Sequence, residues 1–186
     1  MRPEIKNIKQ NLQANNLKGA SEAILKAHEQ IKNYPVLIAF EGVYYAQSGD
    51  FERAIAAFAV ALQRLPRDPV LYYNLASVLR ATGRLVAAEE AIRKSLHFIP
   101  LNPLALYELA QIQTYQGKHN EAILTLFKCI QNSALFFPAY VAITQYFLLD
   151  NHPELAIKLY ETAIKGAPRE QFFKDRLKEL KEPKGL

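Results

Sequence analysis

Few side chains in this sequence could carry catalysis. Its 186 residues include one cysteine and four histidines. Cys129 is a candidate thiol nucleophile, and His119 and His152 are candidate metal ligands. The two histidines lie in different parts of the sequence, however, and no set of carboxylates or cysteines around them completes a metal site. No glycine-rich phosphate-binding loop is present either. The sequence therefore predicts a protein that is not an enzyme and uses no cofactor or metal.

Composition indicates a folded chain and limits where it works. Half of the residues are hydrophobic and 22% are charged, which excludes a disordered or collagen-like protein. One cysteine excludes an internal disulfide framework. No secretory signal follows Met1, and the apolar stretches are shorter than the ~20 residues of a membrane-spanning helix. We expect a cytoplasmic protein without a membrane span.

The elements that must position any functional side chain follow from an internal repeat of about 34 residues. The repeat needs no insertion or deletion between positions 1 and 170, and one phase always carries alanine: Ala20, Ala54, Ala88, Ala122 and Ala156. A second phase carries only glycine or asparagine, the types that most easily adopt a left-handed backbone: Asn15, Gly49, Gly83, Gly117 and Asn151. A third carries small residues, including Ala61, Ser95 and Cys129. This phase predicts that Cys129 packs in the core.

Each repeat has the signals of two helices. In the third, Asp68 can cap a helix that follows from Val70 to Thr82, and Pro69 suits its first turn. Gly83 is expected to end that helix in a left-handed conformation. A second helix is expected from about Leu85 to Ile99, before Pro100. Two helices joined by such a short turn form an antiparallel hairpin.

These residues resemble the tetratricopeptide repeat family, whose unit is a helix–turn–helix of about 34 residues. The matching phases carry the family's small residue in the first helix and its terminal proline: Gly42, Ala76 and Ala110, and Pro66, Pro100 and Pro168. The resemblance implies an all-α fold, a right-handed superhelical solenoid with a C-terminal capping helix. It implies one domain with an irregular first repeat at 1–34, repeats at 35–68, 69–102, 103–136 and 137–170, and a capping helix and tail at 171–186. The first repeat is irregular because Glu4, Asn7 and Asn11 stand where the family has bulky apolar residues.

In the family, the first helices line a concave groove that holds a peptide or a partner helix. Tyrosine rings suit such a groove, and the Asn74 amide can both donate to and accept from a peptide backbone. The alternative is that these side chains only pack between adjacent helices. The groove lacks the lysines of the family's carboxylate clamp, so an internal extended segment or an amphipathic helix fits better than an acidic tail. The candidate groove residues are Phe40, Val43, Tyr73, Asn74, Ser77, Arg80, Tyr107, Glu108, Gln111, Tyr115 and Gln145.

The net charge of +5 lies mainly near the two ends of the chain. A helical-repeat protein that reads nucleic acid would carry positive charge along its inner face, and the predicted groove row has one arginine and one glutamate. Nucleic acid is therefore disfavoured as a ligand. The resulting hypothesis is a non-catalytic adaptor or scaffold that binds a protein or peptide partner. The alternative is a regulatory or assembly module of an enzyme or larger complex.

One apolar stretch departs from the repeat pattern. Residues 134–140 read ALFFPAY where the second and third repeats have polar or charged linkers. Phe136 and Phe137 either cover the gap left by a missing proline or form an exposed patch for a partner or for self-association. Both interpretations stay open at this point.

Overall fold

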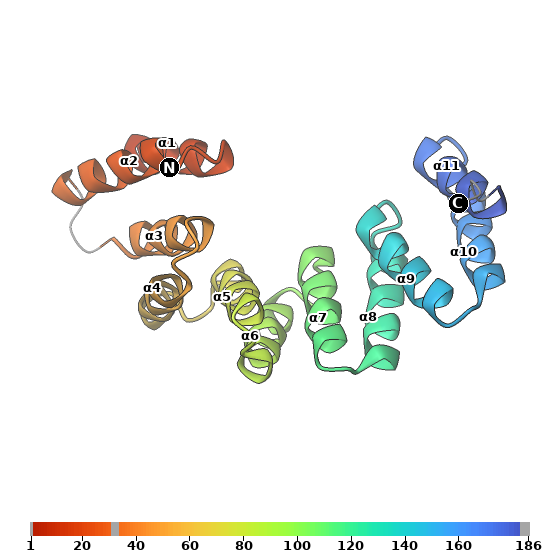
Figure 1. Cartoon of the computed structure of the whole chain (residues 1–186). Coiled ribbons are helices and arrows are strands. Elements are labelled where there is room, and N and C mark those ends of the chain that lie inside the picture. The colour runs from red at the N-terminus through yellow and green to blue at the C-terminus, as the bar shows by residue number, and fades with distance from the viewer. Residues whose placement is uncertain (1, 31–33, 183–186) are drawn as a thin grey trace. The chain divides into compact units, whose positions relative to one another are not determined.

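The computed structural model describes residues 2–30 and 34–182, which form eleven α-helices and no strand (Figure 1). The all-α prediction is confirmed for this part of the chain. Residues 183–186, the tail expected after the capping helix, lie outside it, as do residues 1 and 31–33. The helices are α1 (Pro3–Gln13), α2 (Leu17–Gln30), α3 (Pro35–Gln47), α4 (Phe51–Arg64), α5 (Pro69–Ala81), α6 (Leu85–Phe98), α7 (Pro103–Tyr115), α8 (His119–Asn132), α9 (Phe137–Leu149), α10 (Pro153–Gly166) and α11 (Gln171–Lys181).

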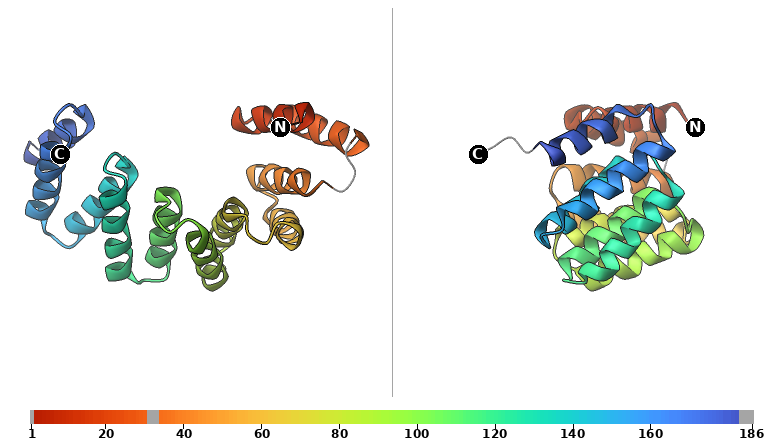
Figure 2. Two further views of the ribbon diagram at one scale, coloured as in Figure 1. Left: turned by 180° about the vertical axis from the view of Figure 1, so that it is seen from behind. Right: turned by 90° about the vertical axis from the view of Figure 1, so that its right-hand side faces the viewer.

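The helices group into two compact units, Met1–Pro100 with α1 to α6 and Leu101–Leu186 with α7 to α11. Helices α3, α5, α7 and α9 each have 13 residues and begin at the same phase of successive repeats. Helices α2, α4, α6, α8 and α10 each have 14 residues and follow the same spacing. Figures 1 and 2 show these helices paired as hairpins. The division into one domain of five repeats and a cap stays a prediction.

The turn within each hairpin has the left-handed residue that the sequence predicts. Positive φ occurs at Gly49 (82°), Gly83 (75°), Gly117 (76°), Asn15 (52°) and Asn151 (59°). Glycine adopts this conformation without a Cβ penalty, and asparagine tolerates it. The left-handed residue ends the first helix and turns the chain back, so all five positions are confirmed as the hairpin turns.

Polar side chains cap the beginnings of α5 and α7. The Asp68 carboxylate accepts hydrogen bonds from the backbone N–H groups of Val70 (2.8 Å) and Leu71 (3.3 Å). Asn102 caps α7 in the same way, through Leu104 N–H at 3.0 Å. The predicted cap at Asp68 is confirmed, and the observed bounds of α5 differ from the expected ones by one residue at each end.

Small residues let the helices of a hairpin approach closely. The five repeat alanines, Ala20, Ala54, Ala88, Ala122 and Ala156, are all fully buried. Gly42 faces the ring of Phe58, so closely that a Cβ there would lie 2.6 Å from Phe58 Cε1. Ser95 Oγ donates to the carbonyl of Pro69 (2.8 Å), and Cys129 Sγ, at the same phase of the next repeat, donates to the carbonyl of Pro103 (3.4 Å). The small-residue phase therefore ties the second helix to the start of the first.

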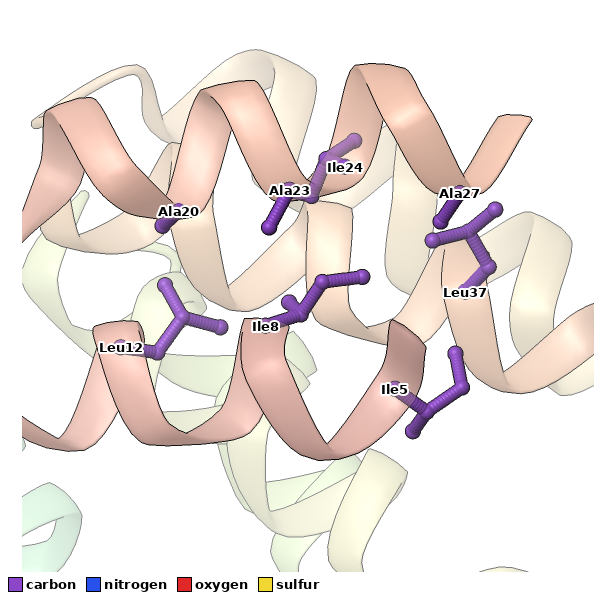
Figure 3. Close-up of a cluster of buried hydrophobic side chains, with 8 residues drawn as sticks. All are labelled: Ile5, Ile8, Leu12, Ala20, Ala23, Ile24, Ala27 and Leu37. Carbon is purple, nitrogen blue, oxygen red and sulfur yellow. The ribbon is translucent and has the colours of Figure 1, made fainter. Parts of the chain in front are cut away.

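The first hairpin forms with its first helix in a shifted register. Helix α1 buries Ile5, Ile8 and Leu12 against α2, as Figure 3 shows. This stripe lies one residue along from Glu4, Asn7 and Asn11, and one residue turns a helix face by about 100°. The displaced amides bond to each other at the surface: Asn11 Nδ2 donates to Asn7 Oδ1 at 3.0 Å. Rotation of α1 thus compensates for the polar residues at the expected apolar phases.

Helix α11 covers the C-terminal end of the second unit with its apolar side, as expected of a capping helix. Phe173 is fully buried against Tyr140 and Tyr160, and Phe172 stacks on Phe137 with ring centroids 4.4 Å apart. Phe136 meets the ring of Tyr107 edge-on at 5.6 Å. Both phenylalanine rings of the ALFFPAY stretch therefore contact other aromatic rings of the second unit. These contacts favour the interpretation that the stretch fills a gap over that of an exposed self-association patch.

Candidate functional site

Four of the predicted groove residues meet in one cleft between α3 and α5, here called the α3/α5 cleft. It has a volume of about 210 Å³ and lies entirely within the first unit. Phe58 of α4 belongs to its lining, so the ring that packs on Gly42 also borders the cleft. The lining residues are Val43, Ala46, Gln47, Phe58, Tyr73, Asn74, Ser77 and Val78.

Helical spacing brings the polar side chains of α5 to the cleft. Tyr73 and Asn74 precede Ser77 by about one helical turn, so the three side chains share one helix face. Ala76, on another face, is fully buried. The cap at Asp68 sets where α5 begins, so it also fixes which residues face the cleft.

The cleft offers hydrogen-bonding groups in neutral surroundings. None of the described residues lining it is acidic, basic or a histidine. The Asn74 amide and the Ser77 hydroxyl make no side-chain hydrogen bond with a described residue, and both side chains are half-buried. Gln47 Nε2 donates to the carbonyl of Leu12 at 3.2 Å. The cleft can therefore supply an amide donor, an amide acceptor and a hydroxyl beside apolar walls.

The other predicted groove residues lie elsewhere. In the first unit, Phe40 packs on the cluster around Ile5 and Ile8, and Arg80 is half-buried on the last turn of α5. In the second unit, Tyr107 and Gln111 are half-buried on α7, and Tyr115 is 62% exposed. Glu108 is only 5% exposed, which leaves little of its side chain for a ligand.

Gln145 lies in a second cleft, between α9 and α11, here called the α9/α11 cleft. Its volume is about 270 Å³, and its lining includes Arg176 and Glu179 of α11, whose side chains form an ion pair at 2.7 Å. Sequence reasoning missed both residues because it considered residues 171–186 only as a capping helix and tail. Their opposite charges, one helical turn apart, were the available signal. The other lining residues are Val141, Thr144, Leu148, Tyr160 and Leu180.

Cys129 and His152, two of the residues considered for catalysis or metal binding, have other interactions in the structure. Cys129 is fully buried, and burial raises the pKa of its thiol to about 11, so the nucleophilic thiolate is strongly disfavoured at neutral pH. The hydrogen bond to Glu154 at 2.8 Å raises the pKa of His152, with smaller contributions from the charges of Glu154 and Asp150. Among the described residues, no three His, Cys, Asp or Glu side chains are grouped as metal ligands would be. No described helix is both long and apolar enough to cross a membrane.

Comparison with known proteins identifies the repeat. Residues 41–103, from α3 to the start of α7, match the model of the tetratricopeptide repeat family. Residues 41–103 thus contain tetratricopeptide repeats, and the similarity of the chain to TPR proteins supports the same family. The chain is 25% identical over 135 residues to a TPR repeat-containing protein of Methanocaldococcus jannaschii. That match covers 66% of this chain and 24% of the relative, so the chain spans about a quarter of the relative's length.

Solved structures share the fold of this chain. MamA superposes with a TM-score of 0.72 at 21% identity, covering 89% of this chain and 94% of MamA. A thermophilic TPR protein of Thermus thermophilus gives 0.71 at 14% identity, covering 95% and 96%. YrrB, described as a TPR protein with an unusual peptide-binding site, gives 0.65 at 18% identity, covering 92% and 88%. The fold is thus an all-α helical-repeat solenoid.

Proposed function

We propose that this tetratricopeptide repeat protein is a non-catalytic adaptor that holds a peptide segment or helix of a partner protein in the α3/α5 cleft. One observation carries the proposal: the Asn74 amide and the Ser77 hydroxyl, neither bonded to a described side chain, line a neutral cleft beside Tyr73 and Val43. The peptide-binding site named for YrrB, which has the same fold, is consistent with such a ligand.

The chemistry of the cleft suggests how a segment would bind. An amide can donate to a backbone carbonyl and accept from a backbone N–H at once, so Asn74 would hold the main chain of the segment. Val43 and Phe58 would receive an apolar side chain, and the Tyr73 ring would add contact area. Because no lining residue described there is charged, we propose a neutral stretch of the partner and neither an acidic tail nor nucleic acid.

The remaining exposed candidates extend the proposal within the second unit. Tyr107, Gln111 and Tyr115 on α7 and Gln145 on α9 have side chains at least partly open to solvent, so we propose them as further partner contacts. Glu108 is left out because of its burial.

Affinity capture with a defined double variant tests the proposal. Wild type and Tyr73→Ala/Asn74→Ala would be used as baits in native cell extract, and a peptide from the captured partner would then be titrated by fluorescence anisotropy. We expect the double variant to bind the peptide about tenfold or more weakly. Gln63→Ala, at an exposed position of α4 outside the cleft, is the control and should bind like wild type. Equal affinity for wild type and the double variant, with both folded by circular dichroism, would exclude this cleft as the binding site.

A further inference from the structure

A larger apolar groove lies between α8 and α10 in the second unit, here called the α8/α10 groove. Its volume is about 460 Å³, within the range of about 300–1,000 Å³ typical of ligand pockets. Of its described lining residues, Lys158 alone is charged. The lining consists of Phe127, Ile130 and Ala134 from α8 and the following turn, Tyr140 and Phe147 from α9, and Leu155, Lys158, Leu159, Thr162, Ala163, Gly166 and Ala167 from α10 and its end.

The first unit has an aromatic ring at the position equivalent to this groove, two repeats or 68 residues earlier in the sequence. Tyr140 and Gly166 correspond there to Tyr72 and Phe98. In the first unit the Phe98 ring stacks over Tyr72, with centroids 6.2 Å apart and ring planes 20° apart. In the second unit a Cβ placed on Gly166 would meet no atom within 4 Å. The second unit therefore has open space where the first unit carries its own aromatic ring.

Among the described residues, the hydroxyl of this tyrosine is hydrogen-bonded in the first unit but not in the second. Tyr72 Oη donates to the carbonyl of Pro66 at 3.2 Å. The counterpart of Pro66 is Ala134, and Tyr140 makes no hydrogen bond with a described residue although it lines the groove. An apolar groove with one hydroxyl at its wall can bind an apolar group and also orient it, since the hydroxyl can donate to a backbone carbonyl.

The charge of the groove also differs from that of its counterpart. Lys158 is exposed and forms no ion pair with a described residue, and the equivalent residue two repeats earlier is Glu90. The acidic residues of α10 are engaged elsewhere: Glu154 bonds to His152 at 2.8 Å, and Glu161 bonds to Lys181 at 2.7 Å. Within the described part of the chain, the groove thus presents one positive charge without a partner, which complements an acidic side chain.

We propose that the α8/α10 groove binds a segment of a partner protein through an aromatic side chain, which enters beside Gly166 and packs on Tyr140 and Phe147. An acidic residue of the same segment pairs with Lys158, and the Tyr140 hydroxyl donates to a backbone carbonyl of the segment. This site is separate from the α3/α5 cleft and does not depend on the function proposed for that cleft. Aromatic anchors in desolvated pockets typically supply much of the binding energy of an interface.

Selection of peptides with a groove-filling variant tests the proposal. A phage-displayed library of random peptides would be selected on the full-length wild-type protein, with Gly166→Phe for counter-selection. Gly166→Phe restores the ring that the first unit has, and Gly166→Ala leaves the groove open and is the matched control. We expect enriched peptides with an aromatic residue and an acidic residue close to it. The most enriched peptide should bind Gly166→Phe about tenfold or more weakly than Gly166→Ala, by fluorescence anisotropy.

Charge reversal provides a second measurement that does not rely on the phenylalanine variant. Lys158→Glu should weaken binding of the selected peptide, and replacing the acidic residue of the peptide by lysine should restore it.

The proposal is overturned if no enriched peptide distinguishes wild type from Gly166→Phe while both are folded, or if the enriched peptides lack an aromatic residue. It is also overturned if sedimentation shows that wild type self-associates and Gly166→Phe does not, because a second copy would then occupy the groove. Retained peptide binding by Tyr73→Ala/Asn74→Ala is expected, because those residues line the other cleft.

Discussion

Replacing Gly42 by alanine tests how closely the two helices of a repeat must approach. A Cβ at this position would lie 2.6 Å from Cε1 and 2.7 Å from Cδ1 of Phe58, distances that real Cβ atoms essentially never show. Phe58 is only 1% exposed, so neighbouring side chains hold its ring closely. We therefore expect the substitution to force either the ring or helix α3 to move.

Two opposing terms set the size of the effect. Alanine is favoured over glycine in a helix interior by about 0.8–1 kcal/mol. Overpacking a well-packed site costs about 1–3 kcal/mol. The net result for Gly42→Ala is a loss of about 0–2 kcal/mol of unfolding free energy. In a Phe58→Leu background the ring is gone, so the propensity term remains and Gly42→Ala should instead stabilise by up to about 1 kcal/mol.

The assay is a double-mutant cycle measured by urea unfolding. Hydrogen exchange at the amides of α3 and α4 would accompany it, because stability in a repeat array is a sum of local terms. Since Phe58 also lines the α3/α5 cleft, Gly42→Ala should weaken peptide binding there as well. If Gly42→Ala changes stability equally in both backgrounds, the close contact with Phe58 is not what requires glycine, and the reasoning fails.

Three further predictions concern the turns and the small-residue phase. Gly83→Ala should lower the unfolding free energy by about 1–2 kcal/mol, because φ at this residue is 75°. Asn151→Gly should raise the unfolding free energy by up to about 1 kcal/mol, because glycine adopts the left-handed conformation more easily than asparagine. If the two substitutions change the unfolding free energy in the same direction in urea, the left-handed conformation is not what these turns require. Ser95→Ala should lower the unfolding free energy by about 0.5–1.5 kcal/mol, because the hydrogen bond to the Pro69 carbonyl is lost. A melting temperature that changes no more than when an exposed serine is replaced by alanine would contradict this contribution of the hydrogen bond. Because burial raises the pKa of the Cys129 thiol to about 11, the folded state keeps the proton that the unfolded chain loses near its ordinary pKa of 9.0. The unfolding free energy should therefore fall as the pH rises from about 9 towards 11, and it should fall less in the Cys129→Ser variant. Rapid labelling of Cys129 by a thiol reagent in the folded protein at about pH 8 would show that the thiol is not buried.

Much of the fold could be predicted because the repeat places the same residue type at the same phase. The five left-handed turns needed only the alignment of glycine and asparagine at one phase of the repeat, and Asp68 followed by Pro69 located the start of α5. The shifted register of α1 could not be predicted in this way. Comparison of the repeats places Asn7 and Asn11 at positions where the family has bulky apolar residues. In the structure the helix is rotated, so that Ile5, Ile8 and Leu12 are buried instead.

The candidate site was predictable only in part. Tyr73, Asn74 and Ser77 follow from their place on the exposed face of a first helix, and Val43 from the same face one repeat earlier. Phe58 has the phase of a core residue, so its second role as a wall of the cleft depends on how near Gly42 brings it. The α8/α10 groove depends on the space between two helices, which no single position in the sequence encodes.

Differences between repeats at one phase separate what the fold requires from what the surface can use. Ser95 and Cys129 differ in chemistry, yet both are small, both are buried and both donate to a proline carbonyl, so the fold accepts either. Phe98 and Gly166 are equivalent positions at the end of a second helix, outside the buried core. There the exchange of phenylalanine for glycine replaces a ring that stacks on Tyr72 with an open groove. The same reasoning applies to Asn74, because the fold accommodates a buried glutamate at the same phase of the next repeat. An amide at Asn74 is therefore not required by the repeat itself, and a binding role gives a physical reason for it.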